Sequence, residues 1–308
     1  MPTQSEPRPR GEWTAKSDAP KRSVFGNYRA DDFCSSGRES APSEQSRLTS
    51  AVTSDQATLQ SAIDLAVARS FLHRFLAKAY EDPTPESWNW LCAPRTRQSI
   101  AAASSACGIS PLPDLIFQPG EYQSFHDAYI ATFGHAARGG CPLNEIEYGD
   151  IKADPLFQPH RLADLAAFYR AFGLEVTQDA GERQDHICLE LEFLCVLAAK
   201  EAYAVEHQLD ADQLAQCRDA QKNFLREHLG RWTPAFTRRL AAATSEPTLR
   251  ALAEFTRAFI ESECARFGVK PGSEELALRP VDEAADRMCD SCGINQLPPG
   301  ALAMESST

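Results

Sequence analysis

Asp185 and His186 stand side by side at the start of an apolar segment, GERQDHICLELEFL, which covers residues 181–194. On a helix, His186 and Glu190 share one face because they lie four residues apart. Together with Asp185 or Glu182 they could bind a metal ion, or they could form a hydrogen-bonded pair. Asp185 and His186 could also act as a general acid and base. Because no nucleophile motif, phosphate loop or dinucleotide fingerprint accompanies them, we predict that the protein is not an enzyme.

A second group of polar residues lies in the segment CPLNEIEYG, residues 141–149. The carboxylates of Glu145 and Glu147 could bind basic side chains of an extended peptide, and the ring of Tyr148 could stack against it. The same residues would also fit a plain connection between two helices. The loop from 134 to 150 exceeds the roughly 12 residues above which a loop in a compact domain is usually functional, so peptide binding is favoured.

The motif CDSCG places Cys289 and Cys292 at the spacing of metal ligands or of a redox dithiol. A closed zinc site needs four ligands, and the sequence has no second pair of this kind. Metal sharing between molecules, a redox dithiol and two unused thiols all remain open. A thiolate metal-binding or redox accessory module is therefore the alternative function. The other cysteines lack the spacing of a disulfide framework, and we predict that most are reduced and buried.

Composition and charge narrow the class of protein. The chain has 308 residues, of which 43% are apolar, enough for a globular core. Its 31 basic and 43 acidic residues give a net charge of −12. Nucleic-acid-binding surfaces need clustered Lys and Arg, so we expect no nucleic-acid partner, whereas a basic partner would suit this charge. The sequence has neither an apolar run of membrane-spanning length nor a secretory signal, which predicts a cytoplasmic protein without membrane insertion.

Three regions are predicted along the chain. Residues 1–55 are rich in Ser, Pro and charged residues and cannot bury enough apolar surface to offset the entropy of ordering, so they form a disordered N-terminal extension. Residues 56–270 form one all-helical domain. Residues 271–308 form a flexible C-terminal tail that carries the C-x-x-C motif.

The helices of the domain follow from apolar periodicity and from capping residues. The first runs from about Ala57 to Tyr80, with its apolar face on Leu59, Ile63, Val67, Phe71 and Phe75, and with Ala66, Leu72, Leu76 and Ala79 beside them. Others are predicted after Thr84 and Pro85, from about 119 to 133, after Pro159 up to Gly173, from about 185, over 211–229, after Thr233 and Pro234, and over 246–267. The helix from 185 has a broad apolar face, which indicates burial on more than one side. We predict an all-α protein with a single compact domain of eight to ten helices.

Four stretches of the sequence resemble, in order, the signature blocks of the TorD/DmsD/NarJ family. They are FHDAYIATFG with CPLNEIEYG, AAFYRAFGLEV, GERQDHICLELEFL and FLREHLGRWTPAF. The resemblance covers about residues 60–268. Members of this family are cytosolic, all-helical chaperones, also called redox enzyme maturation proteins, that assist the assembly of molybdenum-cofactor oxidoreductases.

The resemblance implies particular partners. The chain would bind the apo form of a molybdopterin-containing catalytic subunit, and often its twin-arginine signal peptide. It would hold this client until the cofactor is inserted and so prevent premature export. The chaperone itself would bind no cofactor tightly, although transient contact with molybdopterin guanine dinucleotide is possible.

The resemblance also implies client-binding residues, and these fall on Pro142, Glu145, Tyr148, Glu182, Asp185 and His186. Asp185, at the start of a helix, would accept hydrogen bonds from a client arginine. Two departures from the family pattern stand out: Gln184 replaces a proline, which suggests a looser start of the helix, and Leu143-Asn144 replaces Pro-Tyr. We predict that Asp185, His186, Glu145 and Tyr148 converge on one groove at the rim of a helical cleft.

Overall fold

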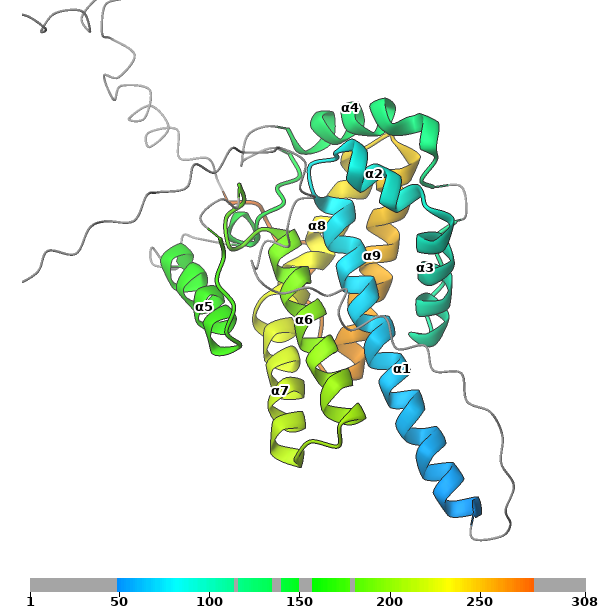
Figure 1. The fold of residues 1–308 in the computed structure, drawn as a ribbon. Helices are drawn as coiled ribbons and strands as arrows, with labels where there is room; N and C mark the ends of the chain where they lie inside the picture. The colour runs from blue at the N-terminus through cyan, green and yellow to red at the C-terminus, as the bar shows by residue number, and fades with distance from the viewer. Residues whose placement is uncertain (1–48, 114–115, 135–139, 150–156, 178–180, 280–308) are drawn as a thin grey trace, which may run out of the picture.

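A computed structural model describes residues 49–113, 116–134, 140–149, 157–177 and 181–279 (Figure 1). Within these ranges the chain forms nine α-helices and two 3-10 turns and has no β-strand, which confirms the all-α prediction. The helices are α1 (Thr49–Tyr80), α2 (Pro85–Cys92), α3 (Pro94–Ala106), α4 (Tyr122–Phe133), α5 (Phe157–Ala171), α6 (Ile187–Glu206), α7 (Ala211–Glu227), α8 (Leu229–Ala243) and α9 (Pro247–Arg266), and the 3-10 turns are η2 (Pro119–Glu121) and η3 (Glu145–Glu147).

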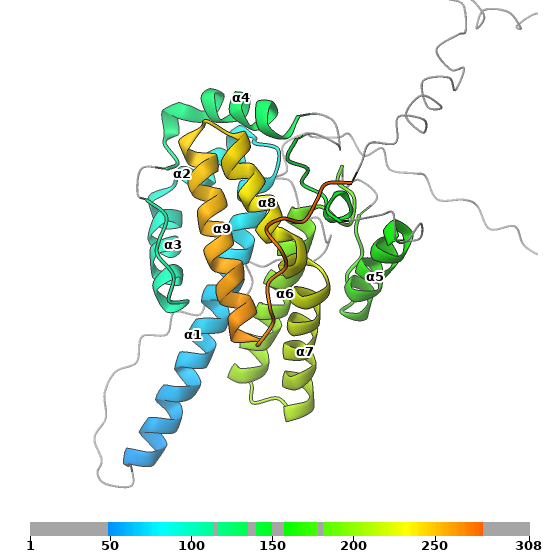
Figure 2. The same ribbon diagram turned by 180° about the vertical axis from the view of Figure 1, so that it is seen from behind.

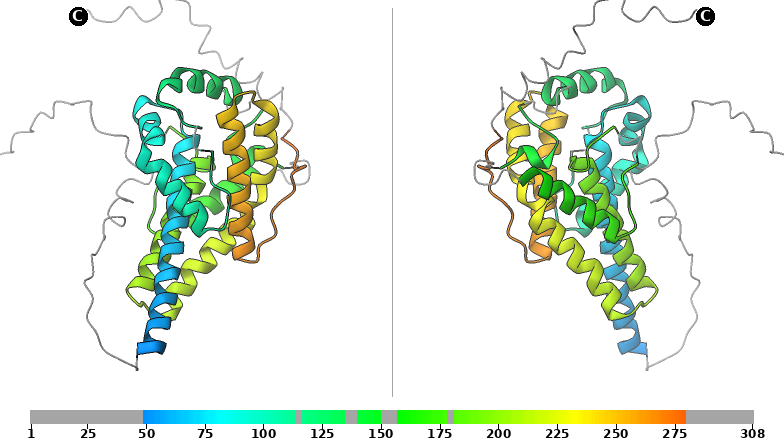
Figure 3. Two further views of the ribbon diagram at one scale, coloured as in Figure 1. Left: turned by 90° about the vertical axis from the view of Figure 1, so that its right-hand side faces the viewer. Right: turned by 90° about the vertical axis from the view of Figure 1, so that its left-hand side faces the viewer.

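Helix α6 lies at the centre of the bundle. It packs along α1 and α7, while α8 and α9 lie behind it, α4 crosses one end, and α5 stands at the side (Figures 1, 2 and 3). Every side chain from Ile187 to Ala199 is buried, which confirms the predicted burial of this helix on several sides. None of the described helices is long and apolar enough to cross a membrane.

Helix α1 differs from the sequence prediction in its length and in its buried face. It begins at Thr49, before the predicted start at Ala57, and its first turns extend beyond the rest of the bundle (Figures 1 and 3). Of the predicted apolar line only Phe75 is fully buried, and Val67 is 39% exposed. The prediction was wrong for this line, whereas Ala66, Leu72, Leu76 and Ala79 beside it are buried as expected, on the side of the helix that also carries the buried Arg69.

Local signals locate other helix ends correctly. Thr84 caps α2 through a reciprocal pair of bonds with Ser87, and Pro85 takes the first helical position, as predicted. Gly134 follows α4 with φ of 72°, a backbone conformation that favours glycine.

The boundary between α7 and α8 was predicted wrongly. The chain breaks at His228, and α8 runs through both Gly230 and Pro234. Because a proline has no N–H, Pro234 cannot donate to the carbonyl oxygen of Gly230, four residues earlier. That oxygen instead accepts a hydrogen bond from the N–H of Gly272 at 2.9 Å. The donor that the helix lacks at Pro234 is thus supplied by a residue beyond α9.

This bond attaches a C-terminal strap, residues 271–279, which runs from the end of α9 past α8 (Figure 2). Arg239 donates to the carbonyl of Leu276 at 3.3 Å. The N–H of Gly149 donates to the carbonyl of Ala277, and the N–H of Arg279 donates to that of Glu147, at 2.9 and 2.8 Å. Of the predicted flexible tail, residues 271–308, only this strap is described, and it is bonded to the domain.

Gly272 is required for the strap to lie where it does, because a Cβ atom there would be 1.8 Å from the carbonyl oxygen of Arg231. We predict that Gly272→Ala detaches the strap, so that amide hydrogen exchange at Gly149 accelerates at least about tenfold. Gly120→Ala is the matched control, since a Cβ atom there meets nothing within 4 Å. Unchanged exchange at Gly149 in Gly272→Ala would show that the strap does not depend on this glycine.

Candidate functional site

The segment 141–149, which we call the site loop, pairs with the start of α6. The N–H of Glu145 donates to the carbonyl of Asp185, and the N–H of Ile187 donates to that of Leu143, both at 2.9 Å. These bonds form an antiparallel bridge between Asn144 and His186. The strap pairs with the other side of the same loop. The two segments identified from the sequence therefore meet through backbone bonds.

Asp185 is fully buried and accepts four hydrogen bonds within the chain. Asn144 Nδ2 donates to Oδ1 and the N–H of Ile146 donates to Oδ2, both at 3.2 Å. Arg183 supplies the other two, from Nε to Oδ1 at 3.0 Å and from Nη2 to Oδ2 at 2.9 Å. The acceptor positions that the sequence analysis assigned to a client arginine are thus held by an arginine of this chain.

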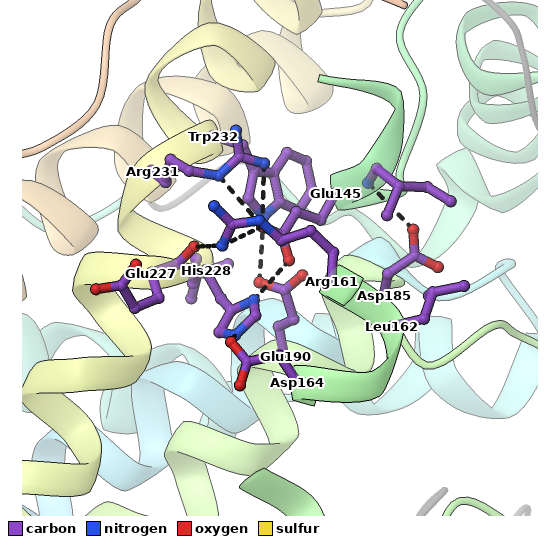
Figure 4. A network of polar contacts seen from close by, with 12 residues as sticks. Glu145, Arg161, Leu162, Asp164, Asp185, Glu190, Glu227, His228, Arg231 and Trp232 are labelled. Carbon is purple, nitrogen blue, oxygen red and sulfur yellow. Dashed lines mark hydrogen bonds and ion pairs between the residues drawn. The ribbon is translucent and has the colours of Figure 1, made fainter. Parts of the chain in front are cut away.

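Glu145 is the centre of a second buried network (Figure 4). His228 Nδ1 donates to Oε2 at 2.8 Å, Arg231 Nη2 donates to Oε1 at 3.0 Å, and Arg161 lies 3.8 Å from Oε1. Burial alone would raise the pKa of Glu145, but the hydrogen bond from His228 and the charges of His228, Arg231 and Arg161 together lower it. Glu145 is therefore ionised at neutral pH and holds α5 and α8 against the site loop.

His228 bridges two carboxylates. Its Nδ1 faces Glu145, and its Nε2 lies 3.2 Å from Oδ2 of Asp164 on α5. The sequence had indicated no role for His228 or Arg231. They are three residues apart, so they lie on one side of a helix turn. A buried carboxylate needs hydrogen-bond partners, and this need was the signal that could have identified both residues.

Tyr148 is buried, so it does not stack on a peptide in this conformation. Its hydroxyl donates to the carbonyl of Pro142 at 2.8 Å, and its ring packs on Trp232 with a centroid separation of 5.0 Å. The backbone carbonyl of Tyr148 accepts hydrogen bonds from Arg231 at 3.2 and 3.3 Å. The side chain of Tyr148 thus holds the two ends of the site loop together and packs the loop against α8.

Glu190 does not pair with His186, so the simple hydrogen-bonded pair considered from the sequence does not form. Trp232 Nε1 donates to Glu190 Oε2 at 3.1 Å. Burial, followed by the negative charge of Glu145, raises the pKa of Glu190 well above its ordinary value. Two carboxylates whose pKa values are shifted in opposite directions are typical of acid–base catalysis. Neither Glu145 nor Glu190, however, lines the pocket of the site.

His186 caps α6 and remains neutral near pH 7. Its Nδ1 accepts a hydrogen bond from the N–H of Cys188 at 3.3 Å, and its Nε2 lies 3.6 Å from Oε2 of Glu182. Burial and, to a smaller extent, the charge of Arg183 lower the pKa of His186 to about 4. No group of three or more potential ligands is placed to hold a metal ion among the residues that the structure covers; Cys289 and Cys292 lie outside them.

Gln184 fastens the segment before α6 rather than loosening it. Its side chain donates to the carbonyl of Leu162 on α5 at 2.7 Å, and its own carbonyl accepts from the hydroxyl of Tyr169 at 2.8 Å. A proline at this position could not form the first of these bonds. The looser start of the helix that the sequence suggested is therefore not what the structure contains.

A pocket of about 350 Å³ lies where the end of α4, the site loop and the segment before α6 meet. Its lining residues are Asp82, Tyr129, Ile130, Phe133, Gly134, Pro142, Leu143, Asn144, Gly181, Glu182, Arg183 and His186. Of the six predicted client-binding residues, Pro142, Glu182 and His186 line it. Glu145, Tyr148 and Asp185 lie buried beneath it, so the six do come together, but in two layers.

The chain is similar to a known protein family and to several known proteins. The model of the nitrate reductase delta subunit family matches residues 112–238. The selenate reductase assembly chaperone protein of Thauera selenatis is 36% identical over 152 residues, which is 48% of this chain and 76% of that protein. The chaperone protein TorD of Vibrio cholerae is 30% identical over 119 residues, 38% of this chain and 52% of that protein.

A longer match comes from the dimethyl sulfide dehydrogenase assembly chaperone protein of Rhodovulum sulfidophilum. It is 31% identical over 243 residues, which cover 74% of this chain and 93% of that protein. The ordered blocks, the all-helical bundle and this nearly full-length match agree. The chain belongs to the TorD/DmsD/NarJ family of molybdoenzyme assembly chaperones.

Proposed function

We propose that this protein binds the apo form of a molybdoenzyme catalytic subunit in the cytoplasm, together with the twin-arginine signal peptide of that subunit. It holds the client until molybdopterin guanine dinucleotide is inserted, and so delays export. It catalyses no reaction of its own, and any contact with the cofactor is transient. The assembly chaperones of selenate reductase and dimethyl sulfide dehydrogenase, to which this chain is similar, support the choice of client class.

One observation carries the proposal: three segments of the signature blocks meet at a single pocket. The end of α4 contributes Tyr129, Ile130, Phe133 and Gly134, the site loop contributes Pro142, Leu143 and Asn144, and the segment before α6 contributes Gly181, Glu182, Arg183 and His186. These stretches are separated in the sequence, and each of them forms one wall of the pocket. A volume of about 350 Å³ suits one or two side chains of a client rather than a whole folded surface.

The chemistry of the pocket favours a peptide with basic and apolar residues. Asp82 and Glu182 are exposed carboxylates on its lining, while Tyr129, Ile130 and Phe133 supply apolar surface. A twin-arginine signal peptide combines cationic side chains with an apolar stretch, so it matches both parts of the lining.

The test begins with capture of the client. Tagged full-length chain, purified from its own host, should bring down a molybdopterin-containing catalytic subunit that lacks its cofactor. A peptide with the N-terminal sequence of the captured subunit is then titrated against the chaperone by fluorescence anisotropy. Glu182→Gln should weaken binding about three- to tenfold, with a smaller effect in high salt because screening reduces exposed charge interactions.

Glu254→Gln on α9 is the matched control, since it removes an exposed carboxylate that does not line the pocket. It should leave the affinity unchanged. Equal affinities of wild type, Glu182→Gln and Glu254→Gln would refute the pocket as the signal-peptide site. Capture of no molybdoenzyme subunit would refute the proposed client.

A further inference from the structure

Arg183 connects the pocket to the buried carboxylates below it. Its side chain is 43% exposed and lines the pocket. Its guanidinium group meets both oxygens of Asp185 at 3.0 and 2.9 Å and lies 3.5 Å from Oε1 of Glu147. Neither Asp185 nor Glu147 lines the pocket, so the guanidinium of Arg183 stands between these carboxylates and the pocket.

Bonds that do not involve Arg183 hold the carboxylate of Asp185 and the backbone of Glu147 in place. Asp185 is oriented by Asn144 Nδ2 and by the N–H of Ile146, both at 3.2 Å. Glu147 lies in the η3 turn, and its carbonyl accepts from the N–H of Arg279 in the strap at 2.8 Å. Removal of the Arg183 side chain would therefore leave the oriented carboxylate of Asp185 open to the pocket, with Glu147 on the adjoining turn.

We propose that Asp185 and Glu147 form a guanidinium-binding site, which Arg183 occupies when no client is present, and that an arginine side chain of the client peptide enters this site by displacing Arg183. The inference rests on the proposed function for the source of the arginine, while the affinity for a guanidinium group is a property of this chain alone. Arg183 thereby competes with the client arginine for this site and lowers the affinity of the chaperone for the client.

Geometry selects guanidinium over ammonium. The paired contacts with Oδ1 and Oδ2 need two parallel N–H donors in one plane, which arginine supplies and lysine does not. Arg183 is two residues from Asp185, and its backbone carbonyl accepts from the N–H of His186 at 2.9 Å, so a tight turn brings its side chain back onto the carboxylate.

Exposure distinguishes this pair from the structural arginines of the bundle. Arg69 makes comparable bonds with Glu263, but its side chain is 2% exposed and has no route to solvent without unfolding. Arg183 already contacts the pocket, so its guanidinium can move into water while the backbone stays in place. Displacement therefore exchanges one guanidinium for another at a site that remains buried.

Chemical rescue tests the site without any client. Arg183→Ala should lower Tm, and ethylguanidinium at about ten times its Kd should raise the Tm of this variant by about 3–6 °C. Ethylammonium at the same concentration should not. The charge of Arg183 also contributes to the low pKa of His186, so in Arg183→Ala the NMR titration of His186 should move upward, and ethylguanidinium should move it back.

Two variants serve as controls. Arg218→Ala removes an arginine of similar exposure from Glu201, which keeps its bonds with Arg69 and Gln221, so ethylguanidinium should not rescue it. Arg183→Ala combined with Asp185→Asn removes the carboxylate that makes the paired contacts and should also show no rescue. Equal responses of Arg183→Ala and Arg218→Ala would overturn the proposal.

Competition is tested with the signal peptide of the captured subunit. Arg183→Ala should bind it at least about threefold more tightly than wild type, and exchange of the peptide arginines for lysine should abolish that gain. Rescue by ethylguanidinium without a gain in peptide affinity would overturn the displacement of Arg183. The proposed chaperone function would then still be judged separately, by capture of the client and by the effect of Glu182→Gln.

Discussion

Glu145→Gln is expected to lower the free energy of unfolding by about 3–5 kcal/mol at pH 7, because loss of one partner leaves buried or half-buried cations without their counter-charge. His228, Arg231 and Arg161 all face this carboxylate. The site loop should loosen as well, since it is held to α5 and α8 through the same side chain. Urea denaturation of the full chain measures the change.

The pH dependence identifies the cause. The pKa of Glu145 in the folded chain lies below its ordinary value of 4.5, so the carboxylate contributes stability that is present above pH 4.5 and is lost as pH falls through the folded pKa. The difference between wild type and Glu145→Gln should therefore shrink below pH 4.5. Glu254→Gln, the exposed control, should change stability little at any pH. A difference that stays constant with pH would contradict the electrostatic explanation.

Arg69→Met is expected to have an effect of similar size, about 3–5 kcal/mol, at the other buried ion cluster. Arg69 binds Glu263 through Nε and Nη2 at 2.7 Å each, and Glu201 through Nη1 at 2.8 Å. These bonds connect α1 to α6 and α9 in the interior. Methionine keeps much of the volume of the side chain, so the loss is chiefly that of the buried counter-charge.

A double variant and an exposed arginine serve as the comparisons for Arg69→Met. Arg69→Met with Glu263→Gln should recover part of the lost stability, because the unpaired buried charge is removed. Arg218→Met should cost only about 0.2–1 kcal/mol, since its side chain is 47% exposed. An equal loss in Arg69→Met and Arg218→Met would show that the cluster does not stabilise the fold.

Acid titration gives a second readout for this cluster. Burial alone would raise the pKa of Glu263, but the charge of Arg69 and the bonds from His73 and Arg69 lower it to about 2. Its contribution is therefore fully present above pH 4.5 and is lost as pH falls from 4.5 towards 2.

Local chemistry made much of the fold predictable from the sequence. Thr84 and Pro85 fixed the start of α2 because capping depends on residues within one turn. The broad apolar face of α6 indicated its central position, because such a surface must be covered on several sides. The meeting of the site loop with the start of α6 followed from the order of the family blocks rather than from any single pattern.

The layering of the site was not predictable in the same way. Acidic residues such as Glu145 and Asp185 are usually exposed. Glu145 is buried here because arginines and a histidine from distant parts of the chain face it, whereas Asp185 is paired with Arg183, two residues away. His228 lies 83 residues from Glu145 in the sequence. The exposure of Val67 has a similar origin, since the buried side of α1 is decided by its contact with α6 and not by its own periodicity.

Pro234 has a consequence for how this site could be altered. A proline inside a helix ordinarily costs about 3 kcal/mol, and its absence would make α8 more regular. In this chain the irregularity leaves the Gly230 carbonyl oxygen to the strap, which supports the outer side of the site loop. Any other residue in place of Pro234 would bring an N–H that competes with Gly272 for the Gly230 carbonyl oxygen. A more regular α8 would therefore weaken the attachment of the strap and loosen the site loop at the wall of the pocket.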